Sequence, residues 1–445
     1  MDDSINYPIV FLGLIWAGIV PISINTLLPS KDYNYMIKDS GAKAVIISPY
    51  LIEKFKSLII DNNVMLIASN QEGYLDLDLL INQNNGALDQ SHKSYEDDVA
   101  FWLYSSGSTG TPKGTLHVHK NLIATANNYA KNVLNISCND VCFSAAKLFF
   151  AYGLGNALTF PMSVGATSIL MSDRPTPESV TNIIKKYSVS IFFGVPTLYA
   201  ALLNSNIDKN DFKSLRLSVS AGEALPATLY EKWFNLLGIN VLDGIGSTEM
   251  LHIFISNTLE NVTAGASGKP VNGYEARLIN DDGTIASDNE IAELEIMGPS
   301  SALSYWNKPE KSNFTFKDSW VRTGDKYIRD SDGIYTYCGR ADDMMKVSGQ
   351  YVSPFEVEAA LQTHKDVLEA AVVANKDNDN LIKPKAFIIL KEHSIQSDDL
   401  KIELTKHVKK QLTPFKYPRW YEFVDSLPKT ATGKIQRYKL RTNDD

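Results

Sequence analysis

Between residues 165 and 242, short apolar runs alternate with segments of helical pattern, and this alternation constrains the fold more than any other feature. The predicted strands are 166–171, 189–193, 215–219 and 240–242, and the predicted helices are 176–186, 196–204 and 226–237. Thr176 followed by Pro177 is typical of a helix start, with an N-cap hydroxyl and a proline in the first turn. Strands that alternate with helices predict a mainly parallel sheet, with ligand sites at the carboxyl ends of its strands.

The pattern differs on both sides of this region. Before it, the sequence predicts a helix over 10–19, a strand over 42–48, a loop over 74–91 and a helix over 117–134. After about residue 265, the pattern favours antiparallel strands at 275–280, 291–297, 320–329 and 334–337, with hairpin turns at 280–283 and 330–333. From Ser353 onward it is typical of an α+β unit, with helices at 354–362 and 398–412 and strands at 368–374 and 386–390.

At 445 residues the chain exceeds the usual size of one domain. We expect an α/β fold whose large N-terminal domain, 1–341, has mainly parallel sheets and a β-rich part over about 265–341. A small mobile α+β domain is expected over 342–445.

Composition excludes several classes of protein. The net charge of −8 argues against nucleic-acid binding, which needs a basic face. Cys138, Cys142 and Cys338 are too few for a disulfide framework and lack the partners of a zinc site, so we expect reduced thiols in a cytoplasmic protein. The apolar run 9–22 is too short for a membrane span and contains Pro21, which favours a core helix. A core helix so near residue 1 suggests that the chain begins inside a domain.

One loop is rich in glycine and hydroxyl groups. The apolar run 99–103, a predicted strand, leads into Ser105-Ser106-Gly107-Ser108-Thr109-Gly110-Thr111-Pro112-Lys113-Gly114. The glycines allow backbone N–H groups to turn toward an anion, the hydroxyls add neutral donors, and Lys113 adds a positive charge. Pro112 stands where the P-loop pattern needs glycine, so the loop is of another kind, although it is suited to a polyphosphate. Taken alone, such a run is more often a surface turn.

Five further segments accompany this loop, in the order 219–226, 243–249, 322–325, 339–349 and 428–434. Their sequences are VSAGEALP, DGIGSTE, RTGD, GRADDMMKVSG and PKTATGK. The six segments together resemble the adenylate-forming superfamily, which includes acyl-CoA synthetases, luciferases and peptide-synthetase adenylation domains. The resemblance implies that 1–341 and 342–445 are its large and small AMP-binding domains.

Within that superfamily the chain is most similar to benzoate-CoA and 4-hydroxybenzoate-CoA ligases, on the segments 147–156, 246–254 and 346–354. The similarity covers the whole chain, although members of the family carry a further N-terminal segment. It implies that an aryl acid, ATP and CoA give aryl-CoA, AMP and diphosphate through an acyl-adenylate. The substrates and cofactors implied are a small carboxylic acid, ATP, CoA and Mg²⁺.

The resemblance also implies residue roles. Lys434 would bridge the carboxylate and the α-phosphate, while Thr109 and Glu249 would position Mg²⁺, a cation that prefers oxygen ligands. Asp325 would accept from the ribose hydroxyls, and Arg340 would reach ribose or phosphate. The nucleotide-binding residues implied are Ser105, Ser106, Gly107, Ser108, Thr109, Gly110, Thr111, Lys113, Gly222, Glu223, Asp243, Gly244, Ile245, Thr248, Asp325 and Arg340.

The acid and CoA sites are implied in the same way. Tyr152 and His252, with Ala151 and Gly153, would form a compact pocket for a flat ring. Ser348 and Gly349 would admit the pantetheine arm of CoA, because a side chain at 349 would block its path. Asp342 would be the hinge about which the small domain moves between the two half-reactions.

Two alternatives stay open. The same chemistry could serve a fatty acid or a carrier protein, although no carrier domain is fused to the chain. An inactive, truncated chain that only binds nucleotide or a partner is the other alternative. A homodimer is possible, and ring substituents and pathway are not determined by the sequence.

Overall fold

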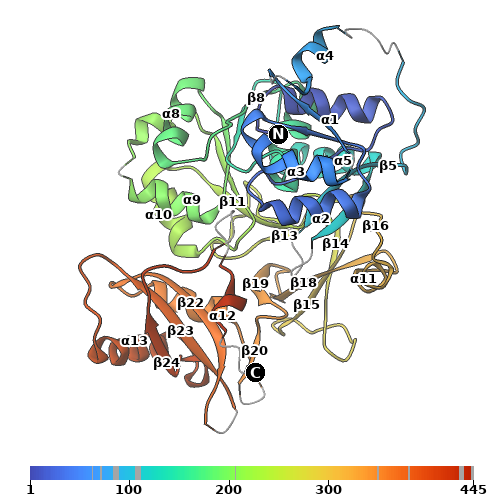
Figure 1. The fold of residues 1–445 in the computed structure, drawn as a ribbon. Helices are drawn as coiled ribbons and strands as arrows, with labels where there is room; N and C mark the ends of the chain where they lie inside the picture. The colour runs from blue at the N-terminus through green and yellow to red at the C-terminus, as the bar shows by residue number, and fades with distance from the viewer. Residues whose placement is uncertain are drawn as a thin grey trace.

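The computed structural model of the chain describes residues 1–62, 64–70, 73–83, 90–105, 112–205, 207–347, 350–378, 381–429 and 435–441. A large helix-rich part lies above a smaller part that holds the C-terminus (Figure 1). The helices of the large part are α1 (Asn6–Trp16), α2 (Ser30–Ser40), α3 (Ile52–Asn62), α4 (Leu77–Gln83), α5 (His119–Thr125), α6 (Ala151–Leu154), α7 (Phe160–Val164), α8 (Pro177–Tyr187), α9 (Pro196–Asn204), α10 (Ala227–Leu237) and α11 (Pro309–Thr315). Among the described residues, no helix combines the length and apolar character that a bilayer span requires.

The largest sheet is buried on both faces. Its order is β13 (Lys269–Pro270), β12 (Ile253–Ser256), β11 (Val241–Gly246), β10 (Leu217–Ser220), β9 (Ile191–Gly194), β7 (Val141–Ser144) and β8 (Thr167–Ile169). The strands from β8 to β11 are parallel, as the sequence predicts. β12 pairs antiparallel with β11, and β13 pairs antiparallel with β12. Phe192 packs in the cluster formed with α8, α9 and α10, and its neighbour Phe193 packs in the cluster on the opposite face.

Three more sheets complete the large part. One contains β1 (Ile22–Ser23), β5 (Val99–Ser105), β6 (Lys113–Val118) and β16 (Ser304–Tyr305), and a second contains β2 (Ala44–Ile47), β3 (Met65–Ala68) and β4 (Leu75–Asp76). The third contains β14 (Glu275–Ile279), β15 (Ala292–Met297), β17 (Phe316–Lys317), β18 (Trp320–Arg329) and β19 (Tyr335–Arg340), and its described neighbours pair antiparallel. This third sheet is the β-rich part that the sequence predicts.

The smaller part has its own apolar core, which begins at Met345. Its elements are β20 (Met345–Val347), β21 (Gln350–Val352), α12 (Pro354–Gln362), β22 (Val367–Lys376), β23 (Ile382–Leu390), α13 (Asp398–Gln411) and β24 (Trp420–Phe423). Figure 1 shows these elements together below the large part. The domain boundary predicted at Asp342 lies in the turn between β19 and β20, and it stays a prediction.

Most predicted elements agree with the structure within about two residues, and the exceptions have physical causes. The helix predicted over 117–134 begins at His119, because β6 first continues to Val118, and from Ala126 to Lys131 it is a π-helix. The loop predicted over 74–91 instead contains β4 and α4. Several strands were missed: β1, β13 and β16 are only two residues long, but β6, β7 and β12, of four to six residues, were missed as well.

An ion pair joins the amino ends of three parallel strands. Arg216 donates from Nε to Oδ1 of Asp140 at 2.8 Å and from Nη2 to Oδ2 at 3.0 Å, and the Ser190 hydroxyl donates to Oδ1 at 2.7 Å. Burial alone would raise the pKa of Asp140, but these hydrogen bonds outweigh burial and lower the pKa to about 2. The charged pair therefore fixes the register of β7, β9 and β10 at this edge.

We predict that Asp140→Asn lowers the free energy of unfolding by roughly 2–3 kcal/mol at pH 7, since it leaves Arg216 without its carboxylate. The folded-state pKa lies below the unfolded value of about 3.9, so this stabilisation is present above that value and is lost as pH falls toward 2. Urea unfolding of wild type and Asp140→Asn at pH 7, 4 and 2.5 measures this difference in the free energy of unfolding.

The matched control is Asp211→Asn, because the partner of Asp211 is Lys185, whose side chain is 66% exposed. This control should lose less than about 1 kcal/mol. If the loss in Asp140→Asn is the same at pH 2.5 as at pH 7, the charge of Asp140 is not its cause.

Candidate functional site

The carboxyl ends of β10 and β11 carry the first group of predicted residues. Gly222, at φ 91°, follows β10, and an added Cβ there would meet only Val195, at 3.9 Å. Asp243 lies next to Ser220 in the sheet and is buried, which raises its pKa well above the usual value. Residues 245–249 then emerge half-buried. The strand ends thus leave the backbone at Gly222 and the side chain of Ile245 open to a ligand.

The hairpin of β5 and β6 carries the glycine-rich loop. Ser105 faces Lys113 across the hairpin, and its hydroxyl is buried with no hydrogen-bond partner among the described residues. Residues 106–111, which include Thr109 and five of the other predicted phosphate-binding positions, lie outside the described residues. The structure therefore places both stems of the loop, and the roles of its tip stay predictions.

Lys113 points at Glu249. Its Nζ lies 3.8 Å from Oε1 of Glu249 and donates to the Tyr305 hydroxyl at 3.1 Å. Burial lowers the pKa of Lys113, Glu249 opposes this change, and the cations Lys311 and Arg340 add to it. The hairpin thus delivers a partly desolvated cation to the end of β11, where a phosphate would be attracted to it.

A buried histidine holds the two elements together. His117, on β6, lies with Nε2 2.9 Å from the carbonyl oxygen of Thr248 and with Nδ1 3.3 Å from Oδ1 of Asn121. Burial lowers the pKa of His117 to about 4, so its ring is neutral at pH 7. His117 was missed in the sequence because a single histidine in a strand carries no signal.

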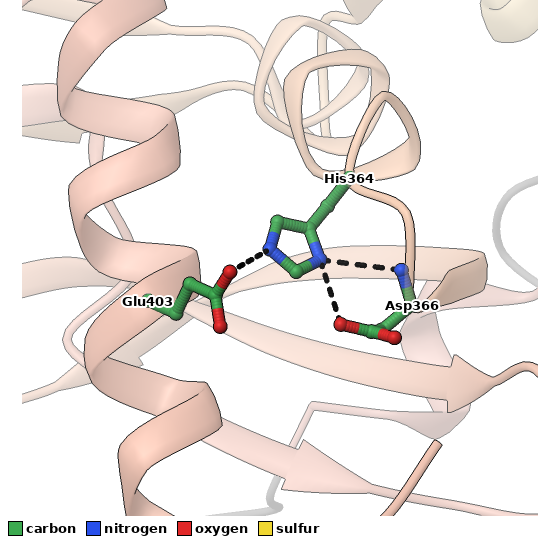
Figure 2. A group of neighbouring side chains, drawn as sticks. All are labelled: His364, Asp366 and Glu403. Atoms are coloured by element: carbon green, nitrogen blue, oxygen red, sulfur yellow. Dashed lines mark hydrogen bonds and ion pairs between the residues drawn. The ribbon is translucent and has the colours of Figure 1, made fainter. Parts of the chain in front are cut away.

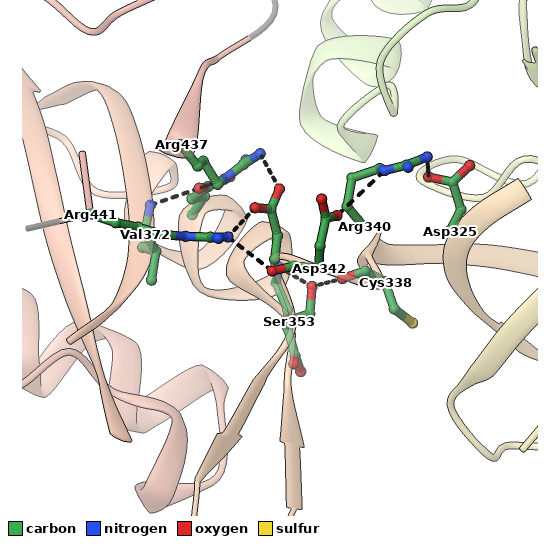
Figure 3. Close-up of polar contacts among 11 residues, drawn as sticks. Asp325, Cys338, Arg340, Asp342, Ser353, Val372, Arg437 and Arg441 are labelled. Atoms are coloured by element: carbon green, nitrogen blue, oxygen red, sulfur yellow. Dashed lines mark hydrogen bonds and ion pairs between the residues drawn. The ribbon is translucent and has the colours of Figure 1, made fainter. Parts of the chain in front are cut away.

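A second pair of charges lies where β18 and β19 meet (Figure 3). Asp325 faces Arg340 across the two strands, and Nη1 of Arg340 donates to Oδ1 of Asp325 at 3.2 Å and to the carbonyl of Thr323 at 3.0 Å. Nε of Arg340 is also 3.7 Å from Oδ1 of Asp342. The structure therefore brings together three residues predicted for ribose, phosphate and the hinge.

The residues predicted for the acid also meet. The rings of Tyr152 and His252 lie 5.5 Å apart, and Phe160 packs edge-on against His252 at 4.5 Å. His252 is fully buried with Nε2 3.0 Å from Oδ1 of Asn156, and burial lowers its pKa to about 3. A neutral His252 would form one wall of a pocket rather than a positive charge for the carboxylate.

Two glycines of this segment lie against other parts of the protein. An added Cβ at Gly155 would lie 2.5 Å from Cδ2 of His252, and one at Gly153 would lie 2.0 Å from the carbonyl oxygen of Lys147. Both glycines therefore make room for the protein itself, and Gly155 admits the His252 ring. Ala151 and Tyr152 are half-buried, and their role in the acid pocket stays a prediction.

In the smaller part, the predicted positions at 348, 349 and 434 lie outside the described residues. The base of the C-terminal hairpin is described: Lys429 bridges Ile435, and the Gln436 N–H donates to the carbonyl of Pro428 at 2.8 Å. Arg437 next binds Glu358 through two hydrogen bonds, at 3.0 and 2.6 Å (Figure 3).

One cluster outside this region contains three side chains of the types that bind metals. His364, Asp366 and Glu403 lie close together in Figure 2. Asp366 is 3.7 Å from Nδ1 and Glu403 is 3.4 Å from Nε2, so the two carboxylates meet opposite edges of one imidazole. One ligand atom from each of the three residues nevertheless lies within 4.8 Å of the others, a spacing compatible with a single ion. Lys365 also lies 4.0 and 3.9 Å from the two carboxylates.

The comparisons with known proteins agree with this geometry. Residues 1–306 match the family model described as AMP-binding enzyme, and residues 356–434 match the AMP-binding enzyme C-terminal domain. The chain belongs to the AMP-binding enzymes. The adenylate-forming α/β fold, with its large and small domains, is thereby confirmed.

Several relatives have names that describe aryl acids. The chain is 52% identical to a benzoate–CoA ligase of Thauera aromatica, over 99% of this chain and 84% of that protein. It is 46% identical to a 4-hydroxybenzoate–CoA/benzoate–CoA ligase of Rhodopseudomonas palustris, over 99% and 83%. Among solved structures, a benzoate CoA ligase from Burkholderia xenovorans LB400 has a TM-score of 0.92 at 49% identity, covering 99% of this chain and 88% of that one.

One more solved structure contains a bound intermediate. The anthranilate CoA ligase AuaEII, in complex with anthranoyl-AMP, has a TM-score of 0.94 at 42% identity, and the match covers 99% of this chain and 85% of that one. The predicted resemblance to benzoate-CoA and 4-hydroxybenzoate-CoA ligases is confirmed by these relatives.

A charge cluster joins the two parts of the molecule. Asp281, in the turn after β14, binds Lys326 at 2.9 Å, and it also contacts Lys346 at 3.2 Å and the hydroxyl of Tyr351. Lys346 and Tyr351 stand on β20 and β21, on either side of positions 348 and 349. Asp281 thus connects the β-rich sheet with the hairpin predicted to admit CoA.

We predict that Asp281→Asn speeds hydrogen exchange of the backbone amides in β20 and β21, with no change in the core strand β22. The Asp281–Lys346 contact, between side chains 54% and 59% exposed, should contribute less than about 1 kcal/mol, whereas Lys326, which is 6% exposed, also loses its carboxylate and adds to the global loss of stability. Salt at 1 M should also speed hydrogen exchange of β20 and β21 in the wild type, because it screens exposed charges.

Asp282→Asn is the control, because Asp282 accepts only within its own turn, from the N–H and hydroxyl of Thr284, among the described residues. Equal exchange rates in wild type and Asp281→Asn would show that this cluster does not hold the hairpin.

Proposed function

We propose that the chain is an acid–thiol ligase that converts an aryl acid of the benzoate type, ATP and CoA to aryl-CoA, AMP and diphosphate. The observation that carries the proposal is the Tyr152–His252 pair beside the nucleotide-binding strand ends, in a chain 52% identical to a benzoate–CoA ligase. The neutral rings of His252 and Phe160 offer faces and edges to a flat aromatic acid. The fatty-acid alternative would need a long apolar tunnel, for which the described residues give no support.

In the first half-reaction, the acid carboxylate attacks the α-phosphate of ATP and diphosphate leaves. Catalysis of this step is mainly positioning and stabilisation of charge. Lys113 and the backbone of the loop would hold the β- and γ-phosphates, Asp325 the ribose, and the segments at Gly222 and Ile245 the adenine. Lys434 would bridge the attacking carboxylate and the α-phosphate.

Glu249 fits a hard divalent cation. Its carboxylate is 17% exposed, and Oε2 makes no hydrogen bond to a described residue. With Thr109 it would hold Mg²⁺, which would neutralise phosphate charge when bound. Lys113 and Tyr305, on Oε1, would keep the carboxylate oriented.

In the second half-reaction, the thiol of CoA attacks the acyl carbonyl carbon of the adenylate and AMP leaves. Ser348 and Gly349 would line the path of the pantetheine arm once the small domain has turned about Asp342. A cytoplasmic location and a homodimer complete the proposal and rest on the sequence alone.

We predict that benzoate is activated with a higher kcat/KM than hexanoate or acetate, measured as diphosphate release across a panel of acids with and without CoA. Tyr152→Ala and His252→Ala should each lower kcat/KM for benzoate by a factor that corresponds to about 1–3 kcal/mol, with little change for ATP.

The pH profile adds a second check, since the pKa of His252 is about 3 and its ring should not titrate between pH 6 and 9. A benzoate-to-hexanoate ratio well below one would exclude the aryl acid and leave the adenylation chemistry in place.

We predict that Lys434→Ala nearly abolishes diphosphate release while the chain stays folded, because the charge that bridges the two reactants is gone. Thioester formation from added acyl-adenylate should survive. Gly349→Leu should show the opposite pattern, since it would obstruct CoA only. Normal diphosphate release in Lys434→Ala would remove Lys434 from the reaction.

A further inference from the structure

Tyr305 lies between the two residues proposed to hold the phosphates and the cation. It is 4% exposed, and its hydroxyl donates to Oε1 of Glu249 at 2.7 Å while accepting from Nζ of Lys113 at 3.1 Å. The Lys113 ammonium also stands over the Tyr305 ring, 4.3 Å from its centre. One buried side chain thus touches both charged groups.

The segment around Tyr305 also holds the main chain of Glu249. The Ala302 N–H donates to the carbonyl of Glu249 at 2.8 Å, and the Ser300 hydroxyl donates to the carbonyl of Met250 at 2.7 Å. Trp306 binds the glycine-rich hairpin, since its backbone N–H donates to the carbonyl of Gly114 at 2.8 Å. This segment therefore fixes the distance between the glycine-rich hairpin and the end of β11.

The Tyr305 hydroxyl is the proton donor in this contact. An ordinary tyrosine hydroxyl has a pKa of about 10 and is protonated at pH 7, and this one lies 2.7 Å from Oε1 of Glu249. A neutral donor orients a carboxylate without cancelling its negative charge, whereas a lysine would both orient and neutralise it. Its contact, like that of Lys113, is to Oε1.

We propose that Tyr305 is a positioning residue for nucleotide binding, whose hydroxyl holds Oε1 of Glu249 and so presents Oε2 to the cation that accompanies ATP. When Lys113 turns to the phosphates, Tyr305 keeps the carboxylate in place. This inference rests on the proposed function, because it assumes that Glu249 serves the cation. It adds a residue outside the six segments that suggest the nucleotide site.

The test is Tyr305→Phe, which keeps the ring and its edge contact with Phe316, 5.2 Å away, and removes only the hydroxyl. Calorimetry on the full chain measures ATP binding with Mg²⁺ and with excess EDTA. We expect affinity for Mg²⁺–ATP to fall roughly tenfold, as for a lost hydrogen bond to a charged group, and affinity for metal-free ATP to change less than about twofold.

Tyr335→Phe is the matched control. Tyr335 is 3% exposed, and its hydroxyl donates to the carbonyl of Ala276 at 3.1 Å, so the substitution also removes one buried tyrosine hydrogen bond. It should leave both affinities unchanged. A fall of equal size with and without Mg²⁺ in Tyr305→Phe would show a general defect of the hairpin and overturn the proposal, as would unchanged binding of Mg²⁺–ATP.

A double-mutant cycle gives a second measurement. In the Glu249→Gln background, Tyr305→Phe should cause no further loss of Mg²⁺–ATP affinity, because the group through which it acts is absent. Additive losses would overturn the proposal. The binding assay needs neither acid nor CoA, so its result does not depend on which acid the chain activates. If the chain activates another acid, the proposed function is wrong, but the assay still tests the role of Tyr305. A wild type that binds ATP equally with and without Mg²⁺ overturns the inference itself.

Discussion

Burial of the central parallel sheet on both faces is the constraint on which the rest of the molecule depends. Every residue of β9 and β10 is buried, so charged groups of this sheet can stand only at the strand ends. At the amino ends, Asp140 and Arg216 neutralise each other and join three strands. At the carboxyl ends the groups are left for a ligand. Burial of the sheet therefore leaves a stabilising ion pair at the amino ends of the strands and the predicted ligand site at their carboxyl ends.

At the carboxyl ends of the strands, the degree of burial decides which titratable groups are charged. His117 and His252 are fully buried, and their lowered pKa values make both rings neutral at pH 7. Lys113 and Glu249 are half-buried at the rim, where a polyphosphate and a cation could meet them. The neutral rings thus lie in the buried part of the predicted site, and the charged groups lie at its rim. This division fits a reaction in which positioning and electrostatic stabilisation carry most of the catalysis.

The sequence predicts residues that belong to a local pattern and misses those that act across distance. Glu249 is found because it follows Gly246-Ser247-Thr248, whereas Tyr305 lies 56 residues away in a strand of two residues with no glycine or proline signal. Gly155 has a clear sequence signal, but its cause, the ring of His252, becomes visible only once the chain has folded. The long strands and capped helices were predictable because their periodicity is local. The π-helix from Ala126 to Lys131 was not, because its pattern is that of an ordinary helix.

A buried ion pair stabilises the small part from within. Glu358 and Arg437 are 5% and 16% exposed and form a bidentate pair inside it, and Glu358 also accepts from the N–H of Val372 at 2.7 Å. Removing one partner of such a pair costs several kcal/mol, whereas exposed pairs such as Asp281–Lys346 contribute at most about 1 kcal/mol.

The contacts across Asp342 include both exposed and buried ones. Among the described residues they include the Asp281 cluster, a hydrogen bond from Ser353 to the carbonyl of Cys338, and an edge contact between Tyr337 and Phe355. Arg437 lies three positions after Lys434, and its pairing with Glu358 ties the base of that hairpin to α12. We therefore expect the small domain to turn about Asp342 as one body, with the contacts across Asp342 broken.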